Sequence, residues 1–139
     1  MQNQVCDKLN SKSYKHTLRA HLIMCCKYRK KLLTWELDTD IKNIVYDISQ
    51  KDDTKFLIDT METDKDHIHI MIEYLPDISI SQIVRRLKQL TTDYIWKHYE
   101  QELKKEFRVE KTFWSDWYFV CSIWDASPET IRKYIENQG

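Results

Sequence analysis

The sequence contains very little glycine or proline, the residues that most often interrupt helices and strands. One glycine and two prolines occur among 139 residues, so glycine-rich phosphate loops, flexible linkers and repeat arrays are not expected. No apolar run reaches the length of a membrane-spanning helix, and no signal peptide is visible at the N-terminus. We therefore expect a single domain over residues 1–139, with residues 1–15 as a loose N-terminal arm.

The cysteines and the net charge exclude further classes of protein. None of the four cysteines forms a C-x-x-C pair, so neither a zinc ribbon nor a disulfide framework is indicated, and reduced thiols of an intracellular protein are expected. The formal net charge is zero, from 22 basic and 22 acidic residues, which counts against a strongly cationic nucleic-acid surface. Basic residues nevertheless gather in two clusters, 27–31 (K-Y-R-K-K) and 85–88 (R-R-L-K).

Hydrophobic periodicity predicts alternating strands and helices. Strands are expected at 17–26, 55–62, 67–74 and 114–124, and residues 63–66 are expected to form a tight hairpin connection. A short amphipathic helix is predicted to begin at Asp38 or Asp40, and a long one at Ser79, with a Ser79–Gln82 capping box, to run to about Phe107. Ser127 and Pro128 begin a last helix that reaches Gln138.

This order of elements predicts the fold. A β-α-β-β-α-β series is typical of an α+β, ferredoxin-like (split βαβ) domain, which has an antiparallel sheet with two helices on one face. The helix at 128–138 is then an extra C-terminal element. It is the only element left to approach the other, open face of the sheet.

The strand at 67–74 carries the most distinctive chemistry. Because strand side chains alternate between the two faces, His67 and His69 share one face and the intervening isoleucines share the other, which is expected to be the core face. Two neutral imidazoles side by side can bind one divalent metal ion, although a His-x-His pair also occurs in strands by chance. His21, on the first strand, is most simply a strand histidine with a satisfied hydrogen bond.

The last helix places Tyr134 and Gln138 one turn apart on one face. A phenol can attack phosphorus and form a covalent link, and a metal ion can polarise a phosphodiester for that attack. Gln138 supplies a carbonyl oxygen that could serve as a third metal ligand. Taken alone, Tyr134 could equally be a packing aromatic.

Together these segments resemble a known family, the single-tyrosine HUH transposases of the smallest bacterial and archaeal insertion sequences (the TnpA type). The resemblance rests on several motifs in the right order and covers nearly the whole chain from about Thr17. They are K-Y-R-K-K at 27–31, T-D-K-D-H-I-H at 63–69, W-Y-F-V at 117–120 with Trp114, and K-Y-I-E-N-Q at 133–138. Ser122–Asp125 and Lys88–Thr92 depart from the glycine-containing patterns usual in the family.

The resemblance implies a function and its residues. His67, His69 and Gln138 would bind Mg²⁺ (or Mn²⁺), and Tyr134 would be the catalytic nucleophile that forms a 5′-phosphotyrosine link on single-stranded DNA. It further implies recognition of DNA hairpins, a homodimer whose active site is shared between chains, and a cytoplasmic protein of a prokaryotic cell. We expect the two basic clusters to contact DNA, through Lys27, Tyr28, Arg29, Lys30, Lys31, Arg85, Arg86 and Lys88.

Two other functions stay open on the sequence. A ferredoxin-like domain of transposase descent could bind single-stranded nucleic acid on its open sheet without cutting it. A metal-dependent phosphoesterase that uses water would leave Tyr134 idle. The basic clusters could also be ordinary solvated faces.

Overall fold

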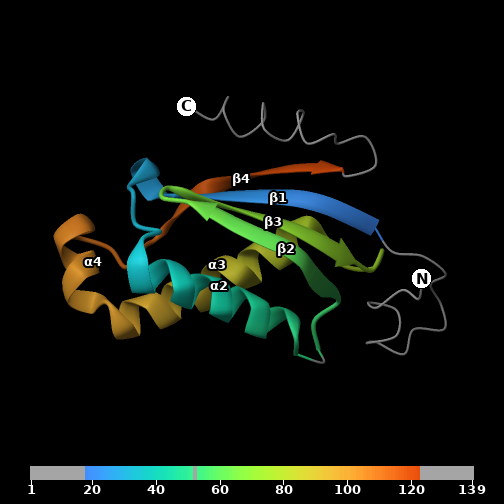
Figure 1. Ribbon diagram of the computed structural model, residues 1–139, viewed down its shortest axis with the longest axis horizontal. Coiled ribbons are helices and arrows are strands. Elements are labelled where there is room, and N and C mark those ends of the chain that lie inside the picture. The colour runs from blue at the N-terminus through green and yellow to red at the C-terminus, as the bar shows by residue number, and fades with distance from the viewer. Residues whose placement is uncertain (1–17, 52, 123–139) are drawn as a thin grey trace.

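The computed structural model describes residues 18–51 and 53–122, which form one antiparallel sheet with its helices on one face (Figure 1). The chain runs through β1 (Leu18–Cys26), the 3-10 turn η1 (Lys27–Arg29), α2 (Trp35–Ser49), β2 (Phe56–Asp64), β3 (His67–Tyr74), α3 (Ile80–His98), α4 (Glu100–Glu106) and β4 (Trp114–Ser122). The order of strands in the sheet is β2-β3-β1-β4. This is the predicted ferredoxin-like arrangement, and the predicted extra helix at 128–138 lies outside the described residues.

The alternation predicted for β3 sets the two faces of the sheet. Ile68, Ile70 and Ile72 are completely buried and join the hydrophobic core. β1 contributes Leu22 and Met24 to the same core face, where they pair with β3 in antiparallel register. The central strands β1 and β3 therefore anchor the core through one face, and their other face carries His21, His67 and His69 together with the buried Ile23 and Cys25.

Two helices cover the core face. α3 begins at the predicted capping box, since the Ser79 hydroxyl accepts from the backbone N–H of Gln82 and the Gln82 side chain accepts from the N–H of Ser79. Ile83, Leu87 and Ile95 of α3 then meet the apolar side of α2 in the core. None of the helices in the described ranges is long and apolar enough to cross a membrane.

α2 begins earlier than the sequence suggested. Its first residue is Trp35, after Thr34 in an extended conformation, whereas Asp38 or Asp40 was predicted to cap it. Both carboxylates instead bind side chains of other elements: Asp38 accepts from Thr63 Oγ1 at 2.6 Å, and Asp40 accepts from the Tyr99 hydroxyl. These partners are distant in the chain, so no local pattern reveals them.

The long helix predicted to reach Phe107 is interrupted. Tyr99 leaves helical geometry (φ −132°, ψ 31°) and divides the segment into α3 and α4. The short helix α4 turns Leu103 and Phe107 back into the core. The prediction of one continuous helix was wrong because these core contacts and the Tyr99–Asp40 hydrogen bond fix the break.

Scarcity of glycine is visible in the turns. Among the described residues, four that are not glycine adopt positive φ: Tyr28, Arg29, Trp35 and Lys65. A left-handed conformation costs a side-chain-bearing residue roughly 1–2 kcal/mol. Lys65 and Asp66 alone connect β2 to β3, because Asp64 already pairs with His67, so the predicted connection at 63–66 is shorter than expected. Lys65 is held there by an isolated bridge to Leu33.

Candidate metal and nucleic-acid site

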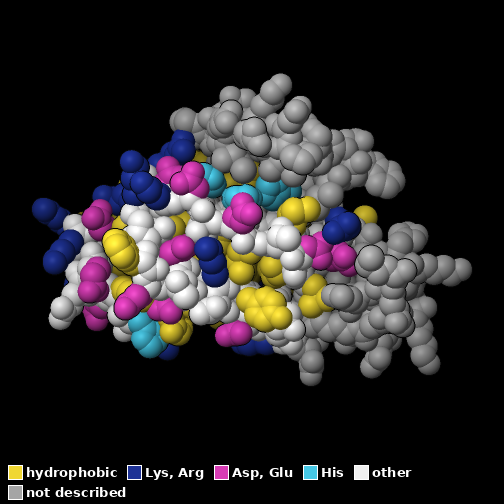
Figure 2. Space-filling model, viewed as in Figure 1, with side chains coloured by type: hydrophobic (Ala, Val, Ile, Leu, Met, Phe, Trp, Pro, Cys, Tyr) yellow, Lys and Arg dark blue, Asp and Glu magenta, His cyan; other side chains and the backbone are white. Residues whose placement is uncertain are grey.

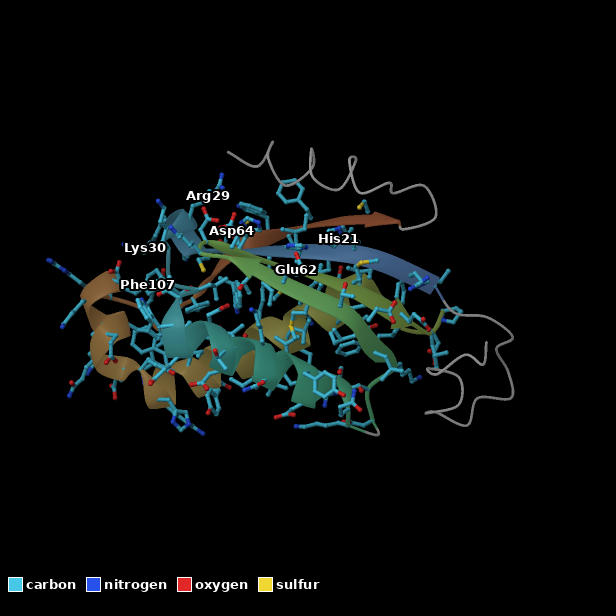
Figure 3. All side chains as sticks on the ribbon, in the orientation of Figure 1. His21, Arg29, Lys30, Glu62, Asp64 and Phe107 are labelled. Carbon is cyan, nitrogen blue, oxygen red and sulfur yellow. The ribbon has the colours of Figure 1, made fainter. Side chains whose placement is uncertain are left out.

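Three histidines meet on the sheet face opposite α2 and α3. His67 and His69 lie on β3, and His21 lies on β1. The ring centroids of His67 and His69 are 6.2 Å apart, and those of His21 and His69 are 5.2 Å apart. Figure 3 shows His21, Glu62 and Asp64 on the side of the sheet away from α2 and α3. In the space-filling view of Figure 2, histidine and acidic side chains gather over this part of the sheet.

His67 is oriented by the residue before it. The Nδ1–H of His67 donates to Asp66 Oδ1 at 2.8 Å. The other oxygen of Asp66 lies 3.2 Å from Arg29 Nη2. Burial alone would raise the pKa of Asp66, but the His67 hydrogen bond and the Arg29 charge together lower it. A carboxylate therefore fixes the proton of His67 on Nδ1 and leaves Nε2 as its lone-pair nitrogen.

His69 has a partner for each of its two nitrogens. Its Nδ1 lies 3.2 Å from Nε2 of His21, and its Nε2 lies 3.5 Å from Glu62 Oε2. Burial lowers the pKa of His69, and the neighbouring His67 adds to this effect, while Glu62 and Asp64 oppose it. The imidazole is consequently neutral at pH 7 and carries one lone pair.

His21 is more deeply buried than a typical strand histidine. It is 1% exposed, and burial, with a smaller effect from His69, lowers its pKa to about 4. Its Nδ1 has no hydrogen-bond partner within the described ranges. The predicted strand histidine with a satisfied hydrogen bond is confirmed, because Nε2 of His21 lies 3.2 Å from Nδ1 of His69, and only its Nδ1 is left without a partner among the described residues.

Two rings on the histidine face could each supply one nitrogen ligand to a divalent metal ion. The Nδ1 atoms of both His67 and His69 are engaged by neighbours, so each ring can present Nε2 to a metal ion. Within residues 18–51 and 53–122, no three His, Cys, Asp or Glu side chains meet as a complete metal-binding group. The predicted third ligand, Gln138, and the predicted nucleophile, Tyr134, both lie outside the described residues.

Most cations of the first basic cluster already have acidic partners. Lys27 pairs with Glu110 and Lys30 with Glu106, each at 2.9 Å, and Arg29 pairs with Asp66. Tyr28 is 73% exposed beside Lys27 Nζ, which lies 5.7 Å from its ring centroid. Lys31 is exposed and makes no ion pair within the described part of the chain.

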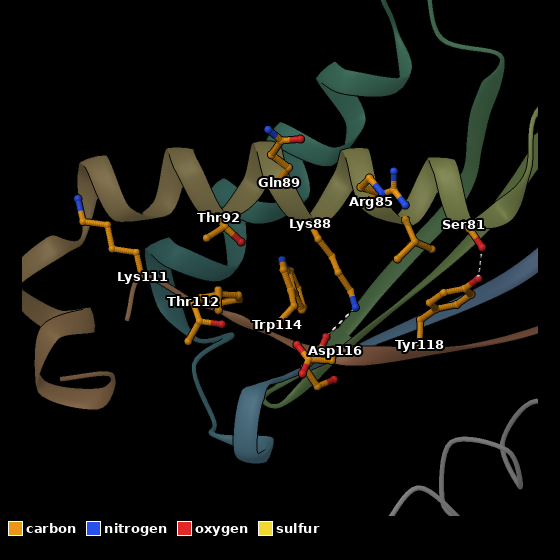
Figure 4. A pocket seen from close by; sticks show the side chains of 13 residues that line it. Ser81, Arg85, Lys88, Gln89, Thr92, Lys111, Thr112, Trp114, Asp116 and Tyr118 are labelled. Atoms are coloured by element: carbon orange, nitrogen blue, oxygen red, sulfur yellow. Dashed lines mark hydrogen bonds between the residues drawn. The ribbon is translucent and has the colours of Figure 1, made fainter. Parts of the chain in front are cut away.

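The three cations of the second basic cluster, on α3, lie in three different environments. Lys88 reaches across to β4 and donates to the carbonyl oxygens of Ser115 and Trp117 at 2.6 and 3.1 Å. Arg86 pairs with Asp53. Arg85 is exposed at the rim of an open pocket of about 500 Å³ between α3 and β4, which Lys88 and Lys111 also line (Figure 4). The second cluster therefore presents Arg85 to solvent, while Lys88 mainly ties α3 to the sheet.

Sequence reasoning missed His21 and Lys111 as participants, and it missed one contact of Arg29. The pairing of β1 with β3 brings His21 beside His69, and Arg29, which was expected to contact DNA, also pairs with Asp66. Lys111 joins the pocket from the loop before β4. Asp66 directly precedes His67 in the sequence, and this adjacency is a local signal for an orienting carboxylate.

Comparisons with known sequences show which proteins this chain is similar to. The family model described as "Transposase IS200 like" matches residues 14–138. The ISDra2 transposase TnpA of Deinococcus radiodurans is 30% identical over 127 residues, which cover 91% of this chain and 88% of that protein. The transposase for insertion sequence element IS200 of Salmonella typhimurium is 25% identical over 132 residues, covering 93% and 84%.

Solved structures show the same fold. A crystal structure of a Deinococcus radiodurans R1 protein assigned as a transposase superposes with a TM-score of 0.78 at 25% identity, over 99% of this chain and 98% of that one. A tyrosine transposase associated with REP sequences, bound to a REP hairpin, superposes with a TM-score of 0.53 at 17% identity, over 91% and 67% of the two chains.

Proposed function

The chain belongs to the IS200-like transposase family, and from this premise we propose that it cleaves and rejoins single-stranded DNA through a covalent tyrosine intermediate. That it is a DNA transposase follows from the family. The metal, the nucleophile, the form of the DNA and the oligomeric state are the proposal. The observation that carries it is the pair His67 and His69, held on the sheet face opposite α2 and α3 with both Nδ1 atoms engaged.

The proposed metal ligands are His67 and His69, with Gln138 as the third. Mg²⁺ (or Mn²⁺) bound there would polarise a phosphodiester oxygen and orient the ester. The chain supports this through Asp66, which fixes the tautomer of His67, and through burial, which keeps His69 neutral. Neutral imidazoles with a defined lone-pair nitrogen are the state in which histidine binds a metal.

The proposed nucleophile is Tyr134. Its phenolic oxygen attacks phosphorus, the bond from phosphorus to the 3′-oxygen breaks, and the 5′-phosphate remains on the tyrosine. The phenol loses its proton and the departing 3′-oxygen gains one, which yields a free 3′-hydroxyl. Attack by that or another 3′-hydroxyl on the phosphotyrosine reverses the step and rejoins DNA, so no external energy source is needed.

The proposed DNA surface uses exposed cations. Lys31 and Arg85 are exposed and make no ion pair within the described part of the chain, so they can contact phosphates without losing a partner. To contact DNA, the other cations would have to replace their carboxylate ion-pair partner with a phosphate; these are Lys27, Arg29, Lys30 and Arg86. A fold relative was solved bound to a REP hairpin, which supports hairpin DNA as the ligand.

The proposed assembly is a homodimer. β4 is an edge strand that pairs only with β1 among the described strands, and it exposes Trp117 and Val120. An exposed edge strand is a ready template for pairing with another chain. Sedimentation at micromolar concentration tests this proposal, and a fully active monomer would contradict it.

Covalent capture tests the proposed chemistry. The purified protein is incubated with Mg²⁺ and a labelled single-stranded oligonucleotide that carries a hairpin, and the products are separated on a denaturing gel. We expect a covalent protein–DNA species that disappears in Tyr134→Phe, because that variant loses only the attacking oxygen. Tyr46→Phe is the matched control, since Tyr46 is an exposed tyrosine on α2 and its variant should capture DNA normally.

The outcomes separate the alternatives. Capture that persists in Tyr134→Phe would place the nucleophile elsewhere, and peptide mapping would identify it. Cleavage without any covalent species would indicate a phosphoesterase that uses water. Tight binding without cleavage would indicate a binding module of transposase descent. Replacement of His67 and His69 by Ala should abolish cleavage and leave the fold intact, because neither side chain belongs to the hydrophobic core cluster.

A further inference from the structure

His21 is a buried histidine that was not predicted to bind the metal, and it contacts the proposed metal ligand His69. Nε2 of His21 lies 3.2 Å from Nδ1 of His69, and the two rings meet edge to face. His21 is 1% exposed, and its second nitrogen has no partner within the described residues. A buried polar atom without a hydrogen bond is uncommon in native structures and calls for an explanation.

We propose that His21 is a positioning residue for the metal ligand His69, whose Nδ1 proton it accepts so that Nε2 of His69 stays open to a divalent ion. This inference rests on the proposed metal centre. His21 is not itself offered as a ligand, since no three such side chains among the described residues form a metal-binding group.

The two neighbours of His69 favour opposite tautomers. A proton on Nε2 would point to Glu62 Oε2 at 3.5 Å and would block the metal. A proton on Nδ1 points to His21 and leaves Nε2 with a lone pair. The Glu62 side chain is 76% exposed, so water competes for it, whereas His21 is shielded from water.

The unpartnered nitrogen of His21 fits this role. If Nδ1 of His21 accepted a proton from a fixed donor, Nε2 would be forced to carry the ring's own proton and to donate to His69. With no such donor among the described residues, His21 can place its proton on Nδ1 and accept through Nε2. Nδ1 of His21 then has no hydrogen-bond partner among the described residues, and Nε2 of His21 can accept the proton of the proposed metal ligand His69.

Binding of Mn²⁺ by the full-length protein tests the proposal without reference to activity. The affinity is measured from the loss of the free Mn²⁺ electron-paramagnetic-resonance signal, for the wild type, His21→Leu, His21→Gln and His67→Ala. His21→Leu should weaken binding 10–100-fold, the usual effect of losing a hydrogen-bond partner of a metal ligand. His21→Gln should keep the wild-type affinity, because its amide oxygen can accept from Nδ1 of His69.

A spectroscopic reading follows the tautomer directly. With saturating Mg²⁺, nitrogen-15 spectra of the wild-type imidazoles should show the His69 proton on Nδ1; a proton on Nε2 would overturn the inference, even if His21→Leu failed to fold. Unchanged Mn²⁺ affinity in folded His21→Leu, with binding lost in His67→Ala, would overturn the role of His21 alone. Equal affinity in the wild type and His67→Ala would overturn the metal centre and this inference together.

Discussion

A single buried hydroxyl joins α3 to β4, and its removal gives a quantitative prediction. Thr91 Oγ1 accepts the indole N–H of Trp114 at 2.8 Å and donates to the carbonyl oxygen of Leu87 at 2.6 Å. Thr91 is fully buried, and Trp114 is 4% exposed. Thr91→Val preserves the shape and the β-branch but leaves the indole N–H without an acceptor.

The expected loss is that of an unsatisfied buried donor, about 1–3 kcal/mol in the free energy of unfolding. For a chain of this size, each kcal/mol lowers the melting temperature by roughly 4 °C. Urea and thermal unfolding, followed by circular dichroism, measure both quantities. The matched control is Thr92→Val, the same substitution at the next, half-buried position, which should change stability by less than about 0.5 kcal/mol.

A double-mutant cycle sharpens the test. In a Trp114→Phe background the indole N–H is absent, so Thr91→Val should cost much less than it does in the wild type. Equal costs for Thr91→Val in the two backgrounds, or equal costs for Thr91→Val and Thr92→Val, would refute the assignment of this hydrogen bond as a stabilising link between α3 and β4.

Two further predictions concern alkaline pH and salt. Burial raises the pKa of Cys26 from an ordinary value of 9.0 to about 12, so the stability it contributes is complete below pH 9 and is lost as the pH rises toward 12. At pH 10 the loss should be on the order of 1 kcal/mol. Urea unfolding at pH 7.5 and 10 should show a smaller alkaline loss in Cys26→Ala; equal losses would contradict the burial argument. Arg85→Gln should reduce the slope of log affinity against log salt for hairpin DNA by roughly one unit or somewhat less, whereas Lys88→Gln, which removes a donor to β4 carbonyls, should leave the slope unchanged and lower the melting temperature. An equal reduction of the slope in both variants would show that Lys88 also contacts phosphate.

Local patterns in the sequence predicted the parts of the fold that depend on neighbouring residues. The β3 bounds and the Ser79–Gln82 capping box are confirmed as predicted, because strand alternation and helix capping act over a few residues. The start of α2 and the break at Tyr99 were not predicted. Both depend on Asp38 and Asp40, which bind residues far away in the chain.

The residues of the candidate site likewise fall into those that local spacing predicts and those that depend on distant segments. His67 and His69 could be recognised from their spacing on one strand, and their shared face is confirmed by the β1–β3 register. His21 carries no local signal, since an isolated histidine in a strand gives no hint of which strand will pair with it. The partners of Arg29, Lys30 and Lys88 likewise come from distant segments. The sequence therefore shows how many cations there are, but not which of them already have a partner.

The position of β1 at the centre of the sheet also sets the order in which the fold can be completed during synthesis. β1 emerges first from the ribosome, yet its neighbours β3 and β4 come much later in the chain. Until β3 is made, Leu22 and Met24 have no sheet partner, and until β4 is made one side of β1 stays without backbone hydrogen bonds. Such long-range pairing is slow and leaves strands open to aggregation. A chain truncated before Trp114 would keep the β2–β3 hairpin and the helices α2 and α3, but it would leave one edge of β1 unpaired. In the full-length chain β4 pairs with that edge.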